Sequence, residues 1–573
     1  MIRTGLVLAV AGILPAVAVA QVPDSAGSAA RAARVLAPYA AAARTAPGCA
    51  VGIAHNGRTV FEGAHGLADI EFGIPNTPQT IFESGSVAKQ FTAASIVLLA
   101  LEGKLGLDEP ARKYIPELPD YGAPLTIRHL LNHTSGVRDW GSVLELTGFG
   151  RGDRVISQQL ALDVITHQRA TDFTPGAEYS YSNSGYTLLS TIVERVSHQR
   201  LPAFTAERFF APLGMTHTGW RYDFTRLVPG RAQAYAPSLV ASGAGVAAAP
   251  GGGVGAGAGG WRLSMPFMNV YGNGGMLTTV GDWLKWNAML ESRSMGGALV
   301  DSLERTGRLN DGRDITYALG LTVNSYRGKR QVAHSGSTAG YNTYLTRFPE
   351  LRLSIAVLCN GASSNPTQIA LRLVDEIAAP LASPVAPDTV AAATGDLQRL
   401  AAFWRDVNTH LPAQTVVENG QLRVSGGAVL RKLRDGSFLA GQGPVRWRFD
   451  TTAAGTVERA TRIAGDGIER FVIAAPWSPT PDVLAQFTGE WRSDEAGAAF
   501  SAVLEKGQLV LTQRPDSRLV LRPLYDGHFA PITGGGVVIW FARDARTRAL
   551  TMHFGASRMR DMPFTRVQAG QRR

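Results

Sequence analysis

The pattern of apolar and polar positions changes about two thirds of the way along the chain. Before residue 390, a stretch with helical apolar spacing at 91–105 accompanies short strand-like runs at 49–54 and 59–62. A His-Asn-Gly turn joins these two runs, which predicts a β-hairpin. Beyond residue 390, apolar and polar residues alternate between Asn-Gly and Asp-Gly turns, as in successive hairpins. The pattern therefore predicts a mixed helical and β domain followed by an all-β region.

The all-β region contains two similar segments of about 90 residues each. Val-Val-Glu-Asn-Gly-Gln-Leu at 416–422 matches Val-Leu-Glu-Lys-Gly-Gln-Leu at 503–509, an offset of 87 residues. A second pair of matching stretches, at 429–438 and 520–529, has an offset of 91. Two copies are too few for a solenoid, and each is long enough to bury its own core. We therefore predict two small β-barrel domains.

Proline-rich stretches mark the predicted domain boundaries. Prolines punctuate the chain at 380–387, and again at 476–481 around a tryptophan. Both stretches have the composition of linkers. The predicted organisation is a signal peptide at 1–20, a first domain at 21–388, and barrels at 389–478 and 479–573.

The first twenty residues predict export. Met1-Ile2-Arg3 is a short basic start, an apolar stretch follows at 5–19, and Ala18-Val19-Ala20 forms a small-x-small cleavage site. A membrane anchor is the weaker interpretation, because the stretch contains a proline and is shorter than the roughly 20 residues of a span. We expect a secreted or periplasmic protein in an oxidising compartment, with no stable membrane span after cleavage.

Composition and charge add little to this picture. The 573 residues are 45% apolar, mean hydropathy is near zero and the formal charge is +10. A basic chain raises the possibility of nucleic-acid binding, but 49 of the 56 basic residues are arginines scattered along the sequence, with no run of five. We therefore expect no nucleic-acid partner. A Gly-rich stretch at 251–260 lacks the Gly-Lys-Ser/Thr ending of a phosphate loop and predicts a flexible insertion.

One serine and lysine pair has spacing suited to catalysis. Only Lys89, of seven lysines, has a serine three residues before it, in Ser86-Val-Ala-Lys89 at the start of the predicted helix. The two side chains then share one helix face, and the helix N-terminus favours an oxyanion at Ser86. Burial lowers the pKa of a lysine, which would let Lys89 act as a base toward Ser86. A capping serine beside a solvated lysine is the alternative interpretation.

A serine nucleophile needs further groups to move protons, and two motifs supply candidates. Tyr-x-Asn occurs at Tyr181-Ser-Asn183 and at 271–273; we favour the first, because the helix that follows can hold the phenol in place. We weighed His-x-Gly stretches at 55–57, 334–336 and 553–555. We favour His334-Ser-Gly336, which precedes a strand pair and where glycine lets a substrate backbone lie against an edge strand.

Other catalytic chemistries find no support in the sequence. It contains no Gly-x-Ser-x-Gly, no His-Glu-x-x-His and no paired Cys-x-x-Cys. His129 and His133 are four residues apart, but no third metal ligand is evident, so we expect them to be structural. We expect no metal and no cofactor.

The order Ser86-Val-Ala-Lys89, Tyr181-Ser-Asn183, His334-Ser-Gly336 resembles the penicillin-recognising serine hydrolases over roughly residues 46–379. This family includes class C β-lactamases, D-alanyl-D-alanine carboxypeptidases, D-aminopeptidases and related esterases. The resemblance implies an α+β fold, in which helices flank an antiparallel sheet. A catalytic domain followed by two barrels is most similar to the D-aminopeptidase branch.

By resemblance, Ser86 is the nucleophile and Lys89 its partner in proton transfer. Tyr181, kept near phenolate by Lys89, would relay the proton to the leaving group, and Asn183 would bind the acyl side of the substrate. The backbone N–H groups of Ser86 and Ser337 would form the oxyanion hole.

Many relatives carry lysine at the position of His334. Its absence disfavours a β-lactamase, since the cation that would hold the β-lactam carboxylate is missing. We expect a secreted serine hydrolase that cleaves amide bonds of small peptides, with a D-residue near the scissile bond, through an acyl-enzyme. Alternatives are a carboxylesterase, a β-lactamase, or a catalytically idle protein that binds peptidoglycan or penicillin. The sequence leaves the oligomeric state and the role of the barrels open, although a barrel loop that lines the cleft is one possibility by analogy with multidomain relatives.

Cys49 and Cys359 are the only cysteines. The family's sheet places the first strand antiparallel to the last strand of the catalytic domain. Cys49 starts one and Cys359 ends the other, so the resemblance implies a disulfide between them.

Overall fold

The computed structural model describes residues 22, 25–149, 154–238, 260–378, 381–382, 387–441, 443–453, 455–513, 516–533, 535–544 and 546–567. The predicted signal peptide at 1–20 and the Gly-rich stretch up to residue 259 lie outside the described residues. Within these ranges, no helix has both the length and the apolar character needed to cross a membrane.

The first domain is built on one six-stranded sheet, in which every neighbouring pair is antiparallel. The strands, in spatial order, are β12 (Thr322–Tyr326), β13 (Lys329–Thr338), β14 (Tyr341–Phe348), β15 (Leu353–Cys359), β1 (Cys49–His55) and β2 (Arg58–His65). β1 and β15 are central and almost wholly buried, which explains why both appear as continuous apolar runs rather than alternating ones.

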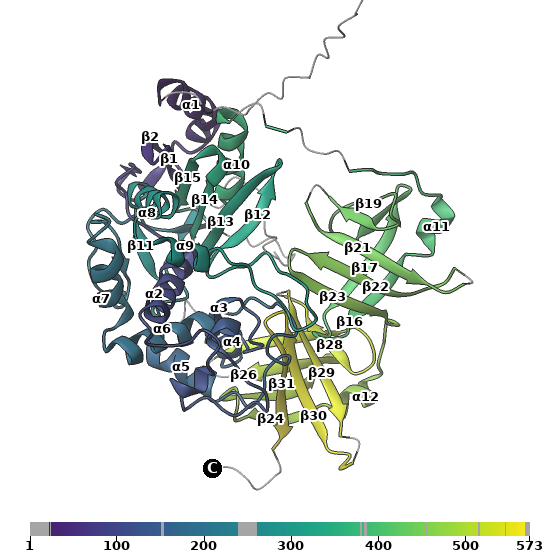
Figure 1. The fold of residues 1–573 in the computed structure, drawn as a ribbon. Helices are drawn as coiled ribbons and strands as arrows, with labels where there is room; N and C mark the ends of the chain where they lie inside the picture. Colours follow the sequence, from purple (N-terminus) through teal and green to yellow (C-terminus); the bar gives the residue numbers. More distant parts are fainter. Residues whose placement is uncertain are drawn as a thin grey trace, which may run out of the picture.

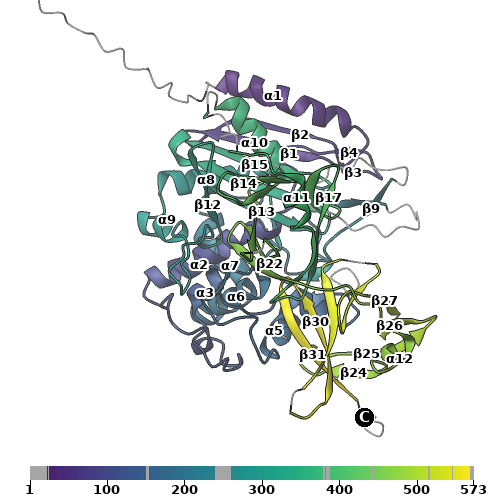
Figure 2. The same ribbon diagram turned by 90° about the vertical axis from the view of Figure 1, so that its right-hand side faces the viewer.

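Helices cover both faces of this sheet (Figure 1, Figure 2). On one face, α1 (Ser25–Ala42) and α10 (Pro366–Ile377) pack against alternate residues of β1 and β15. α8 (Val280–Ser292) covers the other face. Gly52 of β1 permits its close approach, because a Cβ there would lie 3.0 Å from a methyl carbon of Leu284. The predicted α+β fold is confirmed.

A helical region adjoins the α8 face and carries most of the remaining core (Figure 1). Its central helices are α2 (Lys89–Leu101) and α6 (Asn183–Ser197). The others are α3 (Ile127–Leu131), α4 (Trp140–Glu145), α5 (Gln158–Thr166), α7 (Leu201–Thr205) and α9 (Gly297–Leu303). Short strands complete the domain: β3 (Leu67–Asp69), β4 (Ile74–Pro75), β5 (Phe82–Glu83), β6 (Ile156–Ser157), β7 (Gly219–Trp220), β8 (Tyr235–Pro237), β9 (Trp261–Leu263), β10 (Met268–Asn269) and β11 (Met276–Thr278).

Cys49 and Cys359 face each other across the β1–β15 pair and are joined in a disulfide. The bond closes a loop of 310 residues, so it links the two ends of the catalytic domain. It lies in the core beneath α1 and α10.

The all-β region folds as two eight-stranded units with the same strand order. The first contains β16 (Ala402–Asp406), β17 (Pro412–Glu418), β18 (Gln421–Val424), β19 (Leu430–Lys432), β20 (Phe438–Ala440), β21 (Arg446–Thr451), β22 (Val457–Ala464) and β23 (Gly467–Ile473). The second contains β24 (Gly489–Ser493), β25 (Ala498–Glu505), β26 (Gln508–Gln513), β27 (Ser517–Pro523), β28 (His528–Pro531), β29 (Val537–Arg543), β30 (Leu550–Ala556) and β31 (Met559–Arg566). Short helices α11 (Thr394–Gln398) and α12 (Pro481–Ala485) precede them.

The two units differ in closure. β24–β31 form a closed barrel, whereas β16–β23 form a curved sheet whose outer strands, β18 and β19, meet only at the bridge Arg423–Val429. Figure 1 shows the first unit in green and the second in yellow, side by side and both against the catalytic domain. Hereafter they are barrel 1 and barrel 2. Val143 and Leu146 of the catalytic domain belong to the apolar core of barrel 2, so this interface is continuous with a folded core.

Candidate active site

Ser86 lies in a short 3₁₀ turn, Gly85–Ala88, which leads directly into α2. Strand β13 passes against this turn. Gly85 has a positive φ of 52°, and a Cβ on it would come within 2.5 Å of the Ser337 nitrogen. Glycine is required there by both conformation and space. The close approach brings the backbone of β13 beside the half-buried Ser86.

Lys89 is the first residue of α2 and is fully buried. Its amine donates to Ser86 Oγ at 3.0 Å, to Asn183 Oδ1 at 2.9 Å and to the carbonyl oxygen of Asn273 at 2.5 Å. These three acceptors are uncharged, so they stabilise the buried amine by hydrogen bonding and not by ion pairing. The structure therefore brings Ser86, Lys89 and Asn183 into one hydrogen-bonded group.

Tyr181 borders this group. The Lys89 amine lies 4.9 Å from the centre of its ring, and the His133 ring packs against it at 4.1 Å between centres. Burial raises the pKa of the Tyr181 phenol, while the Ser86 hydroxyl beside it and the Arg558 guanidinium act in the opposite direction. Desolvation of the ring outweighs these two effects, which favours the neutral phenol in the unliganded enzyme over the phenolate that the resemblance implies. Tyr181 is a neutral phenol that can donate a proton.

Asn183 is held by a carboxylate that the sequence did not single out. Asp139, fully buried, accepts from the backbone N–H of Asn183 at 2.8 Å and from its Nδ2 at 2.9 Å, both through Oδ2. Its Oδ1 caps α4 by accepting from Gly141 and Ser142. Asp139 thus orients the Asn183 amide, whose oxygen faces Lys89. In this geometry Asn183 positions the lysine, and its expected contact with substrate stays a prediction.

His334 lies on β13, where its side chain is 5% exposed. Nδ1 lies 2.6 Å from the Ser335 carbonyl oxygen, which can only accept, and Nε2 lies 2.9 Å from the Tyr317 hydroxyl. The ring is therefore the Nδ1–H tautomer that accepts from Tyr317. Burial, reinforced by the positive charge of Lys89, lowers the pKa of His334 to about 4. His334 is neutral near pH 7, and both of its nitrogens are engaged.

The edge of β13 is open beside Ser86. β12 pairs with β13 only as far as Ala333, so among the described strands residues 334–338 have a partner on the β14 side alone. A Cβ on Gly336 would lie 2.0 Å from the Ser84 carbonyl oxygen and 3.0 Å from the Ser86 nitrogen. Glycine at 336 thus allows the strand to approach the nucleophile. The oxyanion hole formed by the N–H groups of Ser86 and Ser337 stays a prediction.

The rejected motif alternatives have other roles. The Tyr271 hydroxyl accepts from Arg200 at 3.2 Å, although the neighbouring Asn273 contributes its carbonyl to Lys89. His129 Nδ1 closes a capping box at the start of α3, and His133 Nδ1 accepts from the Ser182 N–H at 3.2 Å.

Barrel 2 reaches the catalytic group through the hairpin between β30 and β31. The Arg558 carbonyl at its tip accepts from the backbone N–H of Asp139 at 3.0 Å, and the guanidinium lies 5.0 Å from the centre of the Tyr181 ring. Barrel 1 contributes Asp466, whose carboxylate accepts from the backbone N–H groups of Thr316 and Tyr317 at 2.7 and 3.0 Å. Residues from all three domains therefore build the site.

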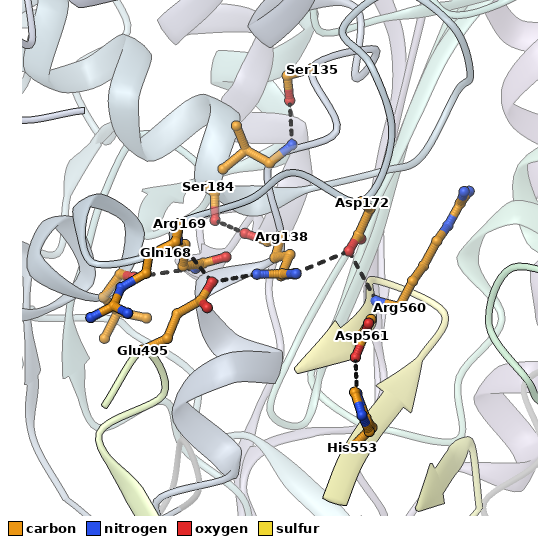
Figure 3. A network of polar contacts seen from close by, with 12 residues as sticks. Ser135, Arg138, Gln168, Arg169, Asp172, Ser184, Glu495, His553, Arg560 and Asp561 are labelled. Carbon is orange, nitrogen blue, oxygen red and sulfur yellow. Dashed lines mark hydrogen bonds and ion pairs between the residues drawn. The ribbon is translucent and has the colours of Figure 1, made fainter. Parts of the chain in front are cut away.

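A buried polar network secures barrel 2 next to the site (Figure 3). Arg138 lies between Glu495 of barrel 2, at 2.5 Å, and Asp172, at 3.3 Å, and all three side chains are less than 10% exposed. Asp172 also accepts from the backbone N–H of Arg560 at 3.0 Å. Because Arg138 directly precedes Asp139, the network fixes the backbone that carries the carboxylate facing Asn183.

Sequence motifs could not single out four of these residues: Asp139, Tyr317, Asp466 and Arg558. Only Asp139 has a local signal, since it follows Ser135-Gly136 as a helix-capping residue. The others depend on contacts between domains.

A serine hydroxyl, a buried amine, a proton-donating phenol and an open strand edge define a serine hydrolase. The chain belongs to the beta-lactamase family, whose model matches residues 32–379.

The chain is similar to a D-aminopeptidase of Gluconobacter oxydans, at 26% identity over 87% of this chain and 95% of that protein. It is also similar to penicillin-binding protein 4* of Bacillus subtilis, at 29% identity over 54% of this chain and 66% of that protein. The chain thus spans just under two thirds of the length of that relative. Among solved structures, an octameric penicillin-binding protein homologue from Pyrococcus abyssi shares the fold, with a TM-score of 0.51 and 19% identity over 87% of this chain and all of that one.

Proposed function

We propose that this protein hydrolyses the amide bonds of small peptides with a D-residue on the acyl side of the scissile bond, through an acyl-enzyme on Ser86. The hydrogen-bonded group of Ser86, Lys89 and Asn183 beside Tyr181 carries this proposal. The preference for D-residues rests on the similarity to D-aminopeptidases; the match to the Gluconobacter protein covers 87% of this chain and so reaches into the region of the two barrels.

In the first step, Lys89 must have given up one proton so that its amine has a free lone pair; it then takes the proton of Ser86 Oγ, 3.0 Å away, while Oγ forms a bond to the amide carbon. The carbonyl oxygen becomes an oxyanion, which the N–H groups of Ser86 and Ser337 stabilise. The open edge of β13 receives the substrate backbone.

In the second step, the carbon–nitrogen bond breaks and the leaving amine takes a proton from the Tyr181 hydroxyl. Lys89, now an ammonium beside the phenol, returns its proton to Tyr181. This requires a protonated phenol at the start, which the raised pKa of Tyr181 provides. Water then cleaves the acyl ester by the same steps in reverse.

A substrate panel tests the proposal. We expect D-alanine p-nitroanilide to be hydrolysed with kcat/KM at least about 100-fold above its L-enantiomer, and above nitrocefin and p-nitrophenyl acetate. Ser86→Ala is expected to lower kcat by about 10³-fold or more, as for other activated serines. Equal rates with both enantiomers would contradict the D-preference. Dominant hydrolysis of nitrocefin or of the acetate ester would instead favour a β-lactamase or an esterase.

We also propose that the mature chain acts outside the cytoplasm, after removal of residues 1–20. The sequence of this segment and the Cys49–Cys359 disulfide support this location, since disulfides persist in oxidising compartments. Fractionation of cells that express the full chain, followed by N-terminal sequencing, is expected to find a protein beginning at Gln21 outside the cytoplasm. An uncleaved cytoplasmic protein would contradict it.

A further inference from the structure

The hairpin tip of barrel 2 places an arginine, Arg558, next to Tyr181 of the catalytic group. Arg558 is exposed, whereas the phenol that its guanidinium covers, Tyr181, belongs to the catalytic group. The hairpin cannot shift easily, because the Arg558 carbonyl is bonded to Asp139 and the following Met559 is 1% exposed in the barrel core. The hairpin backbone that carries the Arg558 guanidinium is therefore held in place.

The other cations near the site are already committed. Lys89 is buried and donates to three acceptors. Arg138 lies between Glu495 and Asp172, and Arg560 is paired with Glu178 at 2.7 Å.

Arg558 differs from these cations. In the described part of the chain its guanidinium forms no hydrogen bond or ion pair, only the contact with the ring of Tyr181. His334, on the strand that flanks the nucleophile, is neutral and has both nitrogens occupied. Arg558 is therefore the permanent cation that remains available to a negatively charged group of a substrate bound beside Tyr181. Arginine suits this role, because its planar fork binds a carboxylate through two parallel hydrogen bonds.

The position of Arg558 indicates which part of the substrate, the acyl group or the leaving group, would carry the negative charge. Tyr181 gives its proton to the leaving amine, so the leaving group must lie against the Tyr181 hydroxyl. Arg558 covers the ring of the same tyrosine, so a leaving group against this hydroxyl has the guanidinium as a neighbour.

We propose that Arg558 binds the free carboxylate of an amino-acid leaving group. The preferred substrates are then short peptides cleaved next to their carboxyl terminus, such as D-dipeptides, rather than simple amides. This inference rests on the proposed function, in which Tyr181 protonates the leaving amine.

The test uses two substrates that differ only in the charge in question. D-alanyl-D-alanine has a free carboxylate, and D-alanyl-D-alanine amide does not. For the full-length enzyme we expect kcat/KM to be about tenfold or more higher for the acid, chiefly through KM. In Arg558→Gln this ratio is expected to fall about tenfold. Because the guanidinium also lowers the pKa of Tyr181, a loss common to both substrates is expected and cancels in the ratio. Arg558→Lys, which keeps the charge but not the planar fork, is expected to retain part of the preference.

Arg518→Gln serves as the matched control, since Arg518 is an exposed arginine of the same barrel that pairs with Glu505. It is expected to leave both rates unchanged. An equal loss on acid and amide in Arg558→Gln would overturn the inference, because the arginine would then act only by positioning Tyr181. An unchanged ratio would overturn it as well.

The same experiment separates this inference from the proposed function. If the wild-type enzyme hydrolyses D-alanine p-nitroanilide and D-alanyl-D-alanine amide but shows no preference for the acid, the inference fails and the proposed function stands. If the wild-type enzyme hydrolyses none of these D-substrates, both fail.

Discussion

The two barrels present the same hairpin to the catalytic domain but place opposite charges at its tip. The β22–β23 turn of barrel 1 has Asp466 as its second residue, and the β30–β31 turn of barrel 2 has Arg558 in the same place. Asp466 is fully engaged: besides two backbone N–H groups, its carboxylate accepts from the Thr316 hydroxyl at 2.9 Å. Among the described residues, Arg558 is hydrogen-bonded through its backbone carbonyl alone, and its guanidinium contacts the ring of Tyr181.

This difference shows how one repeated element can serve two purposes. The Asp466 carboxylate accepts from the backbone N–H of Tyr317, whose hydroxyl is bonded to His334. Barrel 1 therefore supports His334 through Tyr317. Arg558 stands in front of Tyr181, where a substrate would meet it. Substitutions at Asp466 should thus affect all substrates alike, whereas substitutions at Arg558 should discriminate between them.

The largest expected effect separates stability from selectivity. Replacing Cys49 and Cys359 by alanine removes the disulfide between β1 and β15, to which neither hairpin belongs, and is expected to lower the free energy of unfolding by about 4 kcal/mol. The ratio of rates on D-alanyl-D-alanine and its amide should not change. Denaturant unfolding measures the loss of stability, and kinetic assays on the two substrates measure the ratio of rates. A change in this ratio would show that selectivity depends on the stability of the catalytic domain. Labelling of the denatured, unreduced wild-type protein should find no free thiol.

The anchoring of barrel 2 is expected to have the next largest effect. Glu495→Ala removes the barrel's partner of the buried Arg138 and should destabilise the protein by about 3 kcal/mol. Glu505→Ala, which breaks an exposed pair on the same barrel, should cost far less, because solvent screens this pair. Similar losses in the two variants, measured by chemical unfolding, would indicate that barrel 2 is not anchored through Arg138.

His334, which barrel 1 supports through Tyr317, is expected to make the stability of the protein depend on pH. The pKa of His334 is lowered to about 4 in the folded protein, so between about pH 6.5 and pH 4 the unfolded chain binds more protons. Stability from this group is present at neutral pH and lost as the pH falls through that window. It amounts to about 2 kcal/mol between pH 7.5 and pH 5.

His334→Gln should reduce this loss when unfolding is followed across the same pH range. The exposed His167 provides the control, and His167→Gln should leave the pH profile as in the wild type. A wild-type slope retained in His334→Gln would show that His334 is not the group responsible. His133, whose pKa burial lowers well below its usual value, contributes to the slope that remains, as do His65 and His528, whose pKa values burial lowers to about 4.

The smallest effect concerns Asp466 itself. Asp466→Asn leaves fewer acceptors for the Thr316 and Tyr317 groups and is expected to lower kcat about tenfold, equally for D-alanyl-D-alanine and its amide. Glu469→Gln, at a half-exposed ion pair on the same hairpin, should have no effect. A fall in kcat confined to D-alanyl-D-alanine would show that Asp466, like Arg558, acts on only one of the two substrates, which contradicts the proposed difference between the hairpins.

The sequence predicted much of this arrangement, because its motifs are short and local. Ser86 and Lys89 share one helical turn, and Tyr181 and Asn183 lie at the start of one helix, so their relative positions follow from local structure. The barrels were predicted from the turn signals that both copies retain, such as Asp435-Gly436 and Asp526-Gly527.

The contacts between domains could not be predicted in this way. Asp466 and Arg558 occupy equivalent turns but share no side-chain chemistry, so the repeat gave no indication that both reach the site. The neutral state of Tyr181 was missed for a related reason. Its pKa depends on how completely the folded chain buries the ring, and the spacing of a motif carries no information on burial.

Peptide mapping by mass spectrometry, after reaction with a fluorophosphonate probe or labelled penicillin, tests the central claim most directly. If Ser86 is the nucleophile that forms the acyl-enzyme, the adduct is found on the peptide containing Ser86, and Ser86→Ala neither forms it nor turns over D-alanine p-nitroanilide. An adduct on another residue, or a Ser86→Ala variant with full activity, would contradict the account.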